Sequence, residues 1–565
     1  MPSPIPQSRA ATTPSAPNPV PNYERVVDQA AWAARAAAAR PLILDFISRA
    51  RESKKQRAIY DPLRGELSRM RTLIGAVALA RALRGAWEGQ SRVGVLLPPS
   101  AGGILANLAA ALAGRVVVNL NYSAGTAMMT TTARQAGLRT VVTSRLFLEK
   151  ANLELPQGVE PIWIEDVRDR IGKVARIRAA LAAALLPPTA LMRSCGAAAP
   201  LSADDPVTII FSSGSTGDPK GVPLSHRNIA SNVDAASFVL PLDERDCILG
   251  ILPLFHAFGY MVMWFALNRG MSIATYPNPR DAEGIAKTAR EAGVSVVITT
   301  PTFLQMWSRR CTPADFHRLR LVVTGAERLS DALADAFEAR FGVRPIEGYG
   351  MTECAPVVAV CTPGVPERGI PPGTKNGFVG RPLPGVRVKI VDPDTMEELP
   401  PGTPGMILVK GPNVMTCYLD RPDLTRAAFH AGYYVSGDLG YLEDGMLKIA
   451  DRLARFAKIG GEMVPHGRIE DALHEAAGIE AGAFAVTSVP CPRKGEQLVV
   501  LHTLPPEKLP ACLSRLARLG LPNLWLPPER NYVAVRELPV LGSGKLDLRA
   551  VRQRALEALG QRVSV

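Results

Sequence analysis

One stretch of the sequence gathers small hydroxyl residues, glycines and a single lysine within a short distance. It reads TIIFSSGSTGDPKGVPLSH, from Thr208 to His226. Glycines let the backbone approach an anion, successive N–H groups and hydroxyls cradle phosphate oxygens, and a lysine adds a point charge. The pattern is not a Walker A loop, because Gly214 and Gly217 lack its four-residue spacing and no Ser or Thr follows Lys220. The candidate phosphate-binding residues are Ser212, Ser213, Gly214, Ser215, Thr216, Gly217 and Lys220.

This loop resembles the signature of a known family. SSGSTGDPKG is similar to the motif of the adenylate-forming superfamily, which contains acyl-CoA synthetases, luciferases and nonribosomal peptide adenylation domains. Further motifs follow in the family's order: PLFHAFG at Pro253, GAE at Gly325, EGYGMTE at Glu347, SGDLG at Ser436, DRLARFAKIGGE at Asp451 and GSGK at Gly542. The set extends over more than 300 residues, which makes it far more specific than any one motif.

The resemblance implies a site for ATP and Mg²⁺. In EGYGMTE, Tyr349 offers a flat face for adenine, Thr352 a hydroxyl for the α-phosphate, and Glu353 a hard oxygen for Mg²⁺. By the same resemblance, Asp438 contacts the ribose hydroxyls and Arg452 contacts the same nucleotide. Gly325, Ala326, Glu327 and Gly350 complete the implied ATP/AMP-binding set.

The resemblance also implies a two-step reaction. A carboxylate attacks the α-phosphate of ATP, pyrophosphate leaves, and a thiol then attacks the acyl-adenylate so that AMP departs. Lys545 corresponds to the family's adenylation lysine, which bridges the attacking carboxylate and the α-phosphate. The implied catalytic residues are therefore Lys545, Thr352 and Glu353. Between the two steps the family rotates its small C-terminal domain.

Other positions take their roles from the same motifs. His256 and Gly259 fall where the family places its acyl pocket, although a single histidine on an apolar face is also consistent with a satisfied core residue. Ala454 stands at the hinge position, where many relatives have an aspartate or lysine. The implied thiol and pantetheine tunnel consists of Lys458, Gly460 and Gly461.

The elements that must hold these residues indicate an α/β protein. From about Tyr23, short apolar strands alternate with amphipathic helices, which predicts parallel sheets covered on both faces. After about Gly377, short strands with frequent turns predict a small β-barrel. The predicted divisions are a disordered Pro-rich extension (1–22), an adenylating N-terminal domain (23–451, barrel-like at about 377–451) and a small mobile α+β C-terminal domain (452–565) with the catalytic lysine. The boundary is expected at Asp451 to Arg455.

Two apolar segments could in principle span a membrane or lie on its surface. The run from Cys247 to Leu267 has no Asp, Glu, Lys or Arg and is long enough to span a bilayer. Pro253 and Gly259 would interrupt a helix there, which favours a buried strand, turn and helix. The second segment, RIGKVARIRAALAAALLPPTALMR (170–193), fits either an interfacial amphipathic helix or an ordinary packed helix with its cations outward.

Composition narrows the class of protein and its partners. The chain of 565 residues has material for several domains, which fits an enzyme better than a small binding module. Its net charge of +13 attracts anions, but the basic residues are scattered, so nucleic acid is not an expected partner. Eight dispersed cysteines without a C-x-x-C pair predict a reduced, cytoplasmic protein without a metal cluster. Peripheral contact with the inner membrane stays open.

Local features point to a subgroup of the family. RFAKIGGEMV, LPVLGSGKLDL and GLPNLWLPPERNYV are similar to the acyl-acyl carrier protein synthetase half of bacterial bifunctional 2-acylglycerophosphoethanolamine acyltransferases. That resemblance implies a fatty acid substrate and the phosphopantetheine thiol of acyl carrier protein, an acidic partner that suits a basic surface. Those proteins begin with an acyltransferase domain, which we do not find here, so lysophospholipid acylation would need a separate acyltransferase.

Three alternatives remain open at this point. A long- or medium-chain fatty acyl-CoA synthetase would share the first step and use CoA as the thiol. A loading ligase for a biosynthetic carrier protein would differ in its acid. A non-catalytic lipid- or nucleotide-binding relative would lack the reaction altogether.

Overall fold

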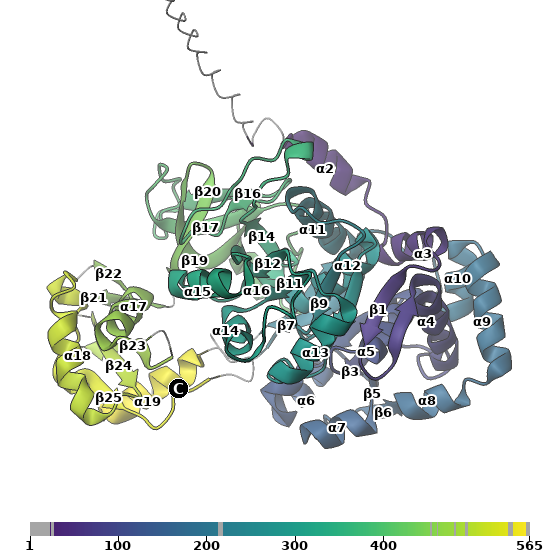
Figure 1. Cartoon of the computed structure of the whole chain (residues 1–565), viewed down its shortest axis with the longest axis horizontal. Coiled ribbons are helices and arrows are strands. Elements are labelled where there is room, and N and C mark those ends of the chain that lie inside the picture. The colour runs from purple at the N-terminus through teal and green to yellow at the C-terminus, as the bar shows by residue number, and fades with distance from the viewer. Residues whose placement is uncertain are drawn as a thin grey trace, which may run out of the picture.

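The structure is a mixed α/β fold with parallel sheets in a large N-terminal domain and a smaller C-terminal domain (Figure 1), as expected. The computed structural model describes Tyr23 and residues 27–212, 219–452, 455–459, 462–479, 482–491, 495–540 and 546–560. The predicted Pro-rich extension, 1–22, lies outside the described residues.

The first sheet carries the loop predicted to bind phosphate. Its strand order is β6-β5-β3-β4-β7-β8, and all neighbours are parallel except the antiparallel pair β7 and β8. Short apolar strands alternating with helices, as the sequence predicted, occur here at residues 92–96, 116–119 and 140–143. The bounds are β3 (Arg92–Leu96), β4 (Val116–Asn119), β5 (Thr140–Thr143), β6 (Glu160–Trp163), β7 (Pro206–Ser212) and β8 (Lys220–Ser225).

The second sheet has nine strands in the order β15-β14-β13-β12-β11-β9-β10-β1-β2. Its centre is parallel, while β2, β14 and β15 pair antiparallel at the two edges. The bounds are β1 (Arg57–Asp61), β2 (Gly65–Ser68), β9 (Cys247–Gly250), β10 (Ser272–Thr275), β11 (Val296–Thr299), β12 (Leu321–Thr324), β13 (Ile346–Gly350), β14 (Val357–Val360) and β15 (Arg381–Pro382).

The region expected to resemble a barrel is an antiparallel sheet. Its strands follow the order β16-β17-β19-β18, and β20 also pairs with the long strand β19. Strand β16 pairs with β17 alone among the described strands. The bounds are β16 (Arg387–Val391), β17 (Gly405–Lys410), β18 (Phe429–His430), β19 (Tyr433–Glu443) and β20 (Met446–Arg452).

The chain after Arg452 has its own sheet and its own core. Strands β22-β21-β24-β23 pair antiparallel, and β25 joins β24 in parallel. The main hydrophobic cluster runs from Val27 to Leu447, whereas the buried residues from Ala457 onward form separate clusters. We therefore propose the domain boundary at residues 451–455. The bounds are β21 (Phe456–Ile459), β22 (Glu462–Pro465), β23 (Phe484–Cys491), β24 (Gly495–His502), β25 (Tyr532–Ala534), α17 (His466–Ala477), α18 (Leu509–Leu516) and α19 (Leu548–Ala558).

Helices cover the sheets of the large domain and mostly begin at side-chain caps. Ser100, Ser225 and Ser330, for example, each accept a hydrogen bond from a backbone N–H of the first turn of the following helix. The principal helices are α3 (Leu42–Glu52), α4 (Arg69–Leu83), α5 (Ala101–Leu112), α6 (Thr126–Gln135), α11 (His226–Val239), α12 (Ala257–Arg269), α13 (Ala282–Ala292), α14 (Pro301–Arg310) and α15 (Asp331–Phe341).

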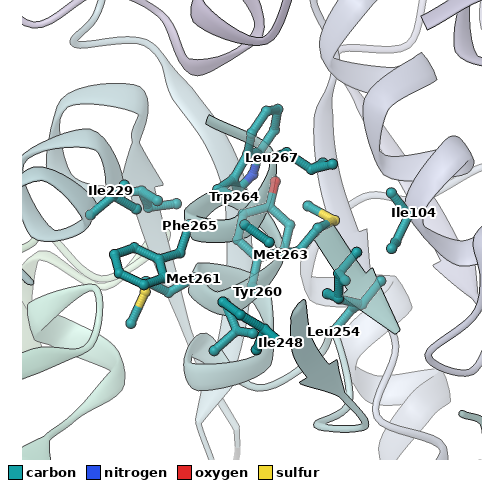
Figure 2. Close-up of a cluster of buried hydrophobic side chains, with 14 of the residues drawn as sticks. Ile104, Ile229, Ile248, Leu254, Tyr260, Met261, Met263, Trp264, Phe265 and Leu267 are labelled. Atoms are coloured by element: carbon teal, nitrogen blue, oxygen red, sulfur yellow. The ribbon is translucent and has the colours of Figure 1, made fainter. Parts of the chain in front are cut away.

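The apolar run from Cys247 to Leu267 is a buried strand, turn and helix, as the sequence favoured. Strand β9 and helix α12 contain it, and nearly every residue of α12 is buried. Figure 2 shows Trp264 and Phe265 of this helix packed among side chains from other elements, with Ile104 of α5 and Ile229 of α11 in the same cluster. No helix in the described part of the chain is long and apolar enough to cross a membrane.

The second questioned segment forms two helices at the edge of the molecule (Figure 1), α9 (Lys173–Leu185) and α10 (Pro188–Cys195). Helix α9 packs on α4 through alanines, namely Ala179, Ala182 and Ala183. A packed helix with only its cations outward was one of the two sequence expectations. The solvent side of α9 instead carries large apolar side chains as well as cations.

Candidate nucleotide site

The phosphate loop connects the two strands of the β7–β8 hairpin. Ser212 ends β7, Lys220 begins β8, and the two residues face each other across the ladder. This register brings both ends of the loop together. The loop residues Ser213, Gly214, Ser215, Thr216 and Gly217 lie outside the described residues, so their phosphate contacts stay a prediction.

Gly221 has a packing reason to follow the lysine. A Cβ at this position would lie 3.0 Å from Cβ of Leu419 and 3.1 Å from the Phe211 ring. The carbonyl of Gly221 accepts a 2.8 Å hydrogen bond from the N–H of Leu419. The missing side chain therefore lets the segment around Leu419 pack directly on strand β8.

That segment brings Tyr418 to the predicted phosphate-binding lysine. Nζ of Lys220 lies 5.4 Å from the centroid of the Tyr418 ring, within the range of a cation–π contact. The Tyr418 hydroxyl donates a 2.9 Å hydrogen bond to Oε1 of Glu353. Tyr418 thus connects the phosphate loop to the predicted Mg²⁺ ligand. Sequence reasoning assigned no role to this tyrosine.

Glu353 is buried in a short 3₁₀ turn, η2 (Thr352–Cys354), after strand β13. Its backbone carbonyl accepts a 2.8 Å hydrogen bond from the N–H of Met415, which fixes the turn. Burial raises the pKa of the Tyr418 phenol, and the nearby Glu353 carboxylate raises that pKa further. Tyr418 therefore keeps its proton and can orient the carboxylate. Half-buried Thr352 begins the same turn.

A second tyrosine orients the predicted ribose ligand. The Tyr349 hydroxyl donates a 2.6 Å hydrogen bond to Oδ2 of Asp438, which is buried in β19. Burial, followed by the negative charge of Asp438, raises the pKa of Tyr349 well above its ordinary value. Asp438 also faces Arg452 across the β19–β20 ladder. The structure thus joins Tyr349 of β13 to Asp438 of β19 and pairs Asp438 with Arg452 of β20, although the Arg452 side chain is outside the description.

The GAE turn lies beside strand β13. A Cβ on Gly325 would lie 3.3 Å from the carbonyl oxygen of Gly348, and Ala326 adopts a left-handed φ of 69°. Glu327 turns toward helix α14, where Oε2 accepts hydrogen bonds from the N–H and hydroxyl of Thr302, at 3.1 and 2.6 Å. The turn therefore borders the same strand as Tyr349, while the nucleotide role of both stays a prediction.

The turn after Tyr349 also depends on a missing side chain. A Cβ on Gly350 would lie 2.1 Å from the carbonyl oxygen of Pro356, a distance that no side chain tolerates. Gly350 therefore allows the chain to fold back tightly before Thr352.

Glu347 is a titratable group that sequence reasoning left without a role. Burial raises the pKa of its carboxyl group to about 7, while the N–H of Leu329, donating to Oε1 at 2.9 Å, opposes that shift. The sequence shows that Glu347 begins the EGYGMTE motif, but only the fold shows that its carboxyl group is buried.

The two predicted acyl-pocket residues lie at the start of α12. His256 is half-buried and precedes the helix as its N-cap residue, with its ring 4.9 Å from that of Phe255. A Cβ on Gly259 would lie 2.4 Å from the Pro253 carbonyl oxygen, so this glycine permits tight packing of the turn. Gly259 borders an apolar cavity of 10 Å³, which is far too small for an acyl chain. The acyl-pocket role of both residues stays a prediction.

A cavity at the surface of the large domain lies elsewhere. It has a volume of 370 Å³ and is lined by arginines and acids of α2 (Gln29–Ala37), α3, α11 and α12. None of the predicted site residues is among its lining residues. Its ion pairs, such as Arg35 with Asp234 and Arg40 with Asp45, are those of a polar surface cleft.

The predicted C-terminal site residues are described only in part. Lys458 lies in β21 opposite Met463, but its side chain is outside the description. Ala454, Gly460, Gly461 and Lys545 lie outside the described residues. Their roles as hinge, thiol tunnel and catalytic lysine remain predictions.

Comparisons with known proteins place the chain among enzymes that bind AMP. A family model described as AMP-binding enzyme matches residues 48–419. The chain is 34% identical over 286 residues to 4-coumarate–CoA ligase 2 of Oryza sativa subsp. japonica, covering 48% of this chain and 49% of that protein. It is 29% identical over 361 residues to a long-chain-fatty-acid–CoA ligase of Escherichia coli O6:H1, covering 62% of each. The matches thus span about half to three fifths of these relatives' lengths.

A solved structure extends the likeness over almost the whole chain. The crystal structure of ATP-bound MatB from Rhodopseudomonas palustris has a TM-score of 0.74 and 25% identity, and it covers 92% of this chain and 99% of that one. The likeness thus includes the C-terminal region that the family model does not match.

Proposed function

Since the chain belongs to the AMP-binding enzyme family, we propose that it is an ATP-dependent, AMP-forming ligase that joins a fatty acid to a thiol. The observation that carries this proposal is the chain of contacts from Lys220 through Tyr418 to Glu353. It connects the strand after the predicted phosphate loop with the Thr352–Glu353 turn, which supports a role for both at one phosphate.

In the first step, the fatty acid carboxylate attacks the α-phosphorus of ATP and the bond to pyrophosphate breaks. The hairpin loop and Lys220 hold phosphate oxygens, and the Thr352 hydroxyl donates to the α-phosphate. Lys545 neutralises charge between the two anions as they approach, because a positioned cation lowers the barrier to such a displacement.

The carboxylate of Glu353 fits a magnesium ligand. It is a hard oxygen donor in a buried turn, and Tyr418 occupies only Oε1 with a single hydrogen bond. Mg²⁺ prefers one or two protein carboxylates together with substrate phosphates. When bound, the ion supplies positive charge that screens the phosphate oxygens, and Tyr418 keeps the carboxylate oriented.

The nucleoside is positioned by Tyr349 of β13 and Asp438 of β19, which the Tyr349 hydroxyl joins by a hydrogen bond. Asp438 accepts from the ribose hydroxyls, while the Tyr349 ring faces the adenine. Arg452, directly across the ladder from Asp438, adds a cation at the end of the same domain. This arrangement holds the adenosine while the phosphates react.

In the second step, a thiolate attacks the acyl-adenylate carbonyl carbon, a thioester forms and AMP leaves with the bonding electrons. Rotation of the C-terminal domain about Ala454 would withdraw Lys545 and bring Lys458, Gly460 and Gly461 to the pantetheine path. We propose acyl carrier protein as the thiol donor, because a chain with a net charge of +13 attracts an acidic partner.

Free CoA is the second candidate thiol donor. The rice and E. coli relatives are both named as CoA ligases, and the first chemical step is the same. The two acceptors differ in what must be recognised: an acidic protein surface in one case, and a nucleotide phosphate in the other.

The experiment that tests the proposal supplies labelled palmitate and ATP with either holo-acyl carrier protein or CoA, and then detects the thioester. Preferential labelling of the carrier protein, decreasing with salt, supports the proposed acceptor. Labelling of CoA alone assigns the protein as an acyl-CoA synthetase. Absence of any thioester or released pyrophosphate refutes the ligase proposal.

A further inference from the structure

Helix α9 (Lys173–Leu185) turns large apolar side chains toward solvent. Val174, Ile177, Leu181 and Leu185 are 63%, 59%, 56% and 73% exposed. At 3.6 residues per turn they fall within about 80° of one another on the helix surface. They form a continuous apolar stripe, which we call the α9 stripe.

The α9 stripe faces solvent because the opposite side of the helix packs on α4. Ala179, Ala182 and Ala183 are buried and lie on the opposite side of the helix, toward α4. The Arg51 guanidinium donates hydrogen bonds to the carbonyls of Ala183 and Leu186, at 2.9 and 2.6 Å. The small alanines seat the helix closely, so the stripe cannot turn inward without breaking this packing.

Cations flank the stripe on both sides. By helical geometry, Lys173 lies along one border of the stripe and Arg178 along the other, each within about 40° of the nearest apolar residue. The sequence contains no Asp or Glu from Ile171 to Cys195. An apolar stripe between cationic borders matches the two layers of an anionic bilayer surface, with acyl chains below and headgroups above.

We propose that the α9 stripe docks the protein onto an anionic lipid surface, with the helix lying in the plane of the interface. The helix has 13 residues, which is too short to span a bilayer. It lies at the outer edge of the molecule, on the side away from the C-terminal domain (Figure 1), so a flat surface can reach it. The flanking cations favour lipid headgroups over an apolar protein groove. The proposal does not rest on the enzymatic function.

Co-sedimentation of the full chain with vesicles tests this proposal without ATP or acyl substrate. Vesicles of phosphatidylcholine mixed with phosphatidylglycerol should bind the wild type, and vesicles of phosphatidylcholine alone should bind it far less. The double substitution Ile177→Asp/Leu181→Asp should lower binding to the mixed vesicles by at least roughly tenfold. Lys173→Gln/Arg178→Gln should lower it by roughly tenfold as well, since each cation contributes near an anionic surface.

The matched control is Leu63→Asp, which places the same charge on another exposed apolar residue, 79% exposed, in the β1–β2 turn. This variant should bind vesicles as the wild type does, and urea unfolding should show that all variants are folded. Equal binding by the wild type and the Ile177→Asp/Leu181→Asp variant overturns the proposal. Sedimentation velocity without vesicles tests the alternative. If the wild type is a dimer and the Ile177→Asp/Leu181→Asp variant is a monomer, the stripe binds a second copy of the chain and the proposal is overturned.

Discussion

The Tyr418 hydroxyl donates a 2.9 Å hydrogen bond to Oε1 of Glu353, while the same ring lies 5.4 Å from Nζ of Lys220. Tyr418 and Glu353 are 65 residues apart in the chain. Through this pair, Tyr418 connects the predicted phosphate-binding lysine with the predicted Mg²⁺ ligand, which are far apart in the sequence. Tyr418 therefore has a positioning role.

The substitution Tyr418→Phe tests that role. The ring stays near Lys220, but the buried Glu353 carboxylate loses a donor. Because a hydrogen bond to a charged group contributes about 1.5–3 kcal/mol, adenylation should slow by about tenfold or more. The loss should shrink at high Mg²⁺ if the carboxylate is merely misplaced. Tyr434→Phe is the comparison: its hydroxyl contacts that of Tyr418 at 3.4 Å, whereas the hydrogen bond to Glu353 comes from Tyr418, so this variant should slow adenylation less. Equal rates for wild type and Tyr418→Phe over a Mg²⁺ titration would contradict the role.

Tyr349→Phe should act on nucleotide binding. The change removes the 2.6 Å hydrogen bond that orients Asp438, and the phenylalanine retains the flat face for adenine. We expect the KM for ATP to rise by roughly tenfold with a smaller change in kcat. Tyr441→Phe on the same strand should leave both constants near their wild-type values. A fall in kcat at constant KM would argue against a ribose role for Asp438.

Much of this architecture could be predicted because it depends on residues that are close together in the sequence. The loop from Ser212 to Lys220 was recognisable from its glycines and hydroxyls, and it does connect two strands. The run from Cys247 to Leu267 contains a proline and a glycine that bar a spanning helix, and Gly259 does pack against backbone carbonyls. Such features depend on neighbours in the chain.

The contributions that were missed depend on distant contacts. Tyr418 lies in CYLDRP, which has no catalytic pattern, and it reaches the site only because Gly221 lets its segment pack on β8. The raised pKa of Glu347 is a consequence of burial by the fold. The outward apolar stripe of α9 could not be separated from an ordinary amphipathic helix, because the sequence does not say which face packs on α4. The thiol acceptor stays a proposal, because the residues expected to meet it lie outside the description or are described only by their backbone.

Glu347 makes the free energy of unfolding depend on pH, and its contribution decreases as the pH rises. Burial raises the pKa of its carboxyl from an ordinary value of 4.5 to about 7, so the native state holds this proton more tightly than the unfolded chain. The contribution to stability is present in full below pH 4.5 and is lost as the pH rises to about 7, by up to about 3 kcal/mol. Urea unfolding of wild type and Glu347→Gln at several pH values checks this. The difference in unfolding free energy between the two should vary across that window. A constant difference would show that Glu347 titrates normally.

Lys545→Ala should separate the two half-reactions. We expect formation of the acyl-adenylate to be lost, while transfer from a supplied acyl-adenylate to the thiol continues. Rapid-quench measurement of each half-reaction provides the comparison, and Lys508→Ala, a lysine elsewhere in the C-terminal region, serves as control. If a folded Lys545→Ala variant fails in both half-reactions, the assignment of the adenylation lysine is wrong.

The central claim is that this chain forms acyl-adenylates at a site containing Glu353. Fatty-acid-dependent exchange of labelled pyrophosphate into ATP measures that step alone, without any thiol. The wild type should show exchange that requires both fatty acid and Mg²⁺, and a folded Glu353→Gln variant should lose it by two orders of magnitude or more, as for removal of a metal-positioning carboxylate. Absence of exchange in the wild type with every fatty acid tried, or undiminished exchange in Glu353→Gln at limiting Mg²⁺, would contradict the claim.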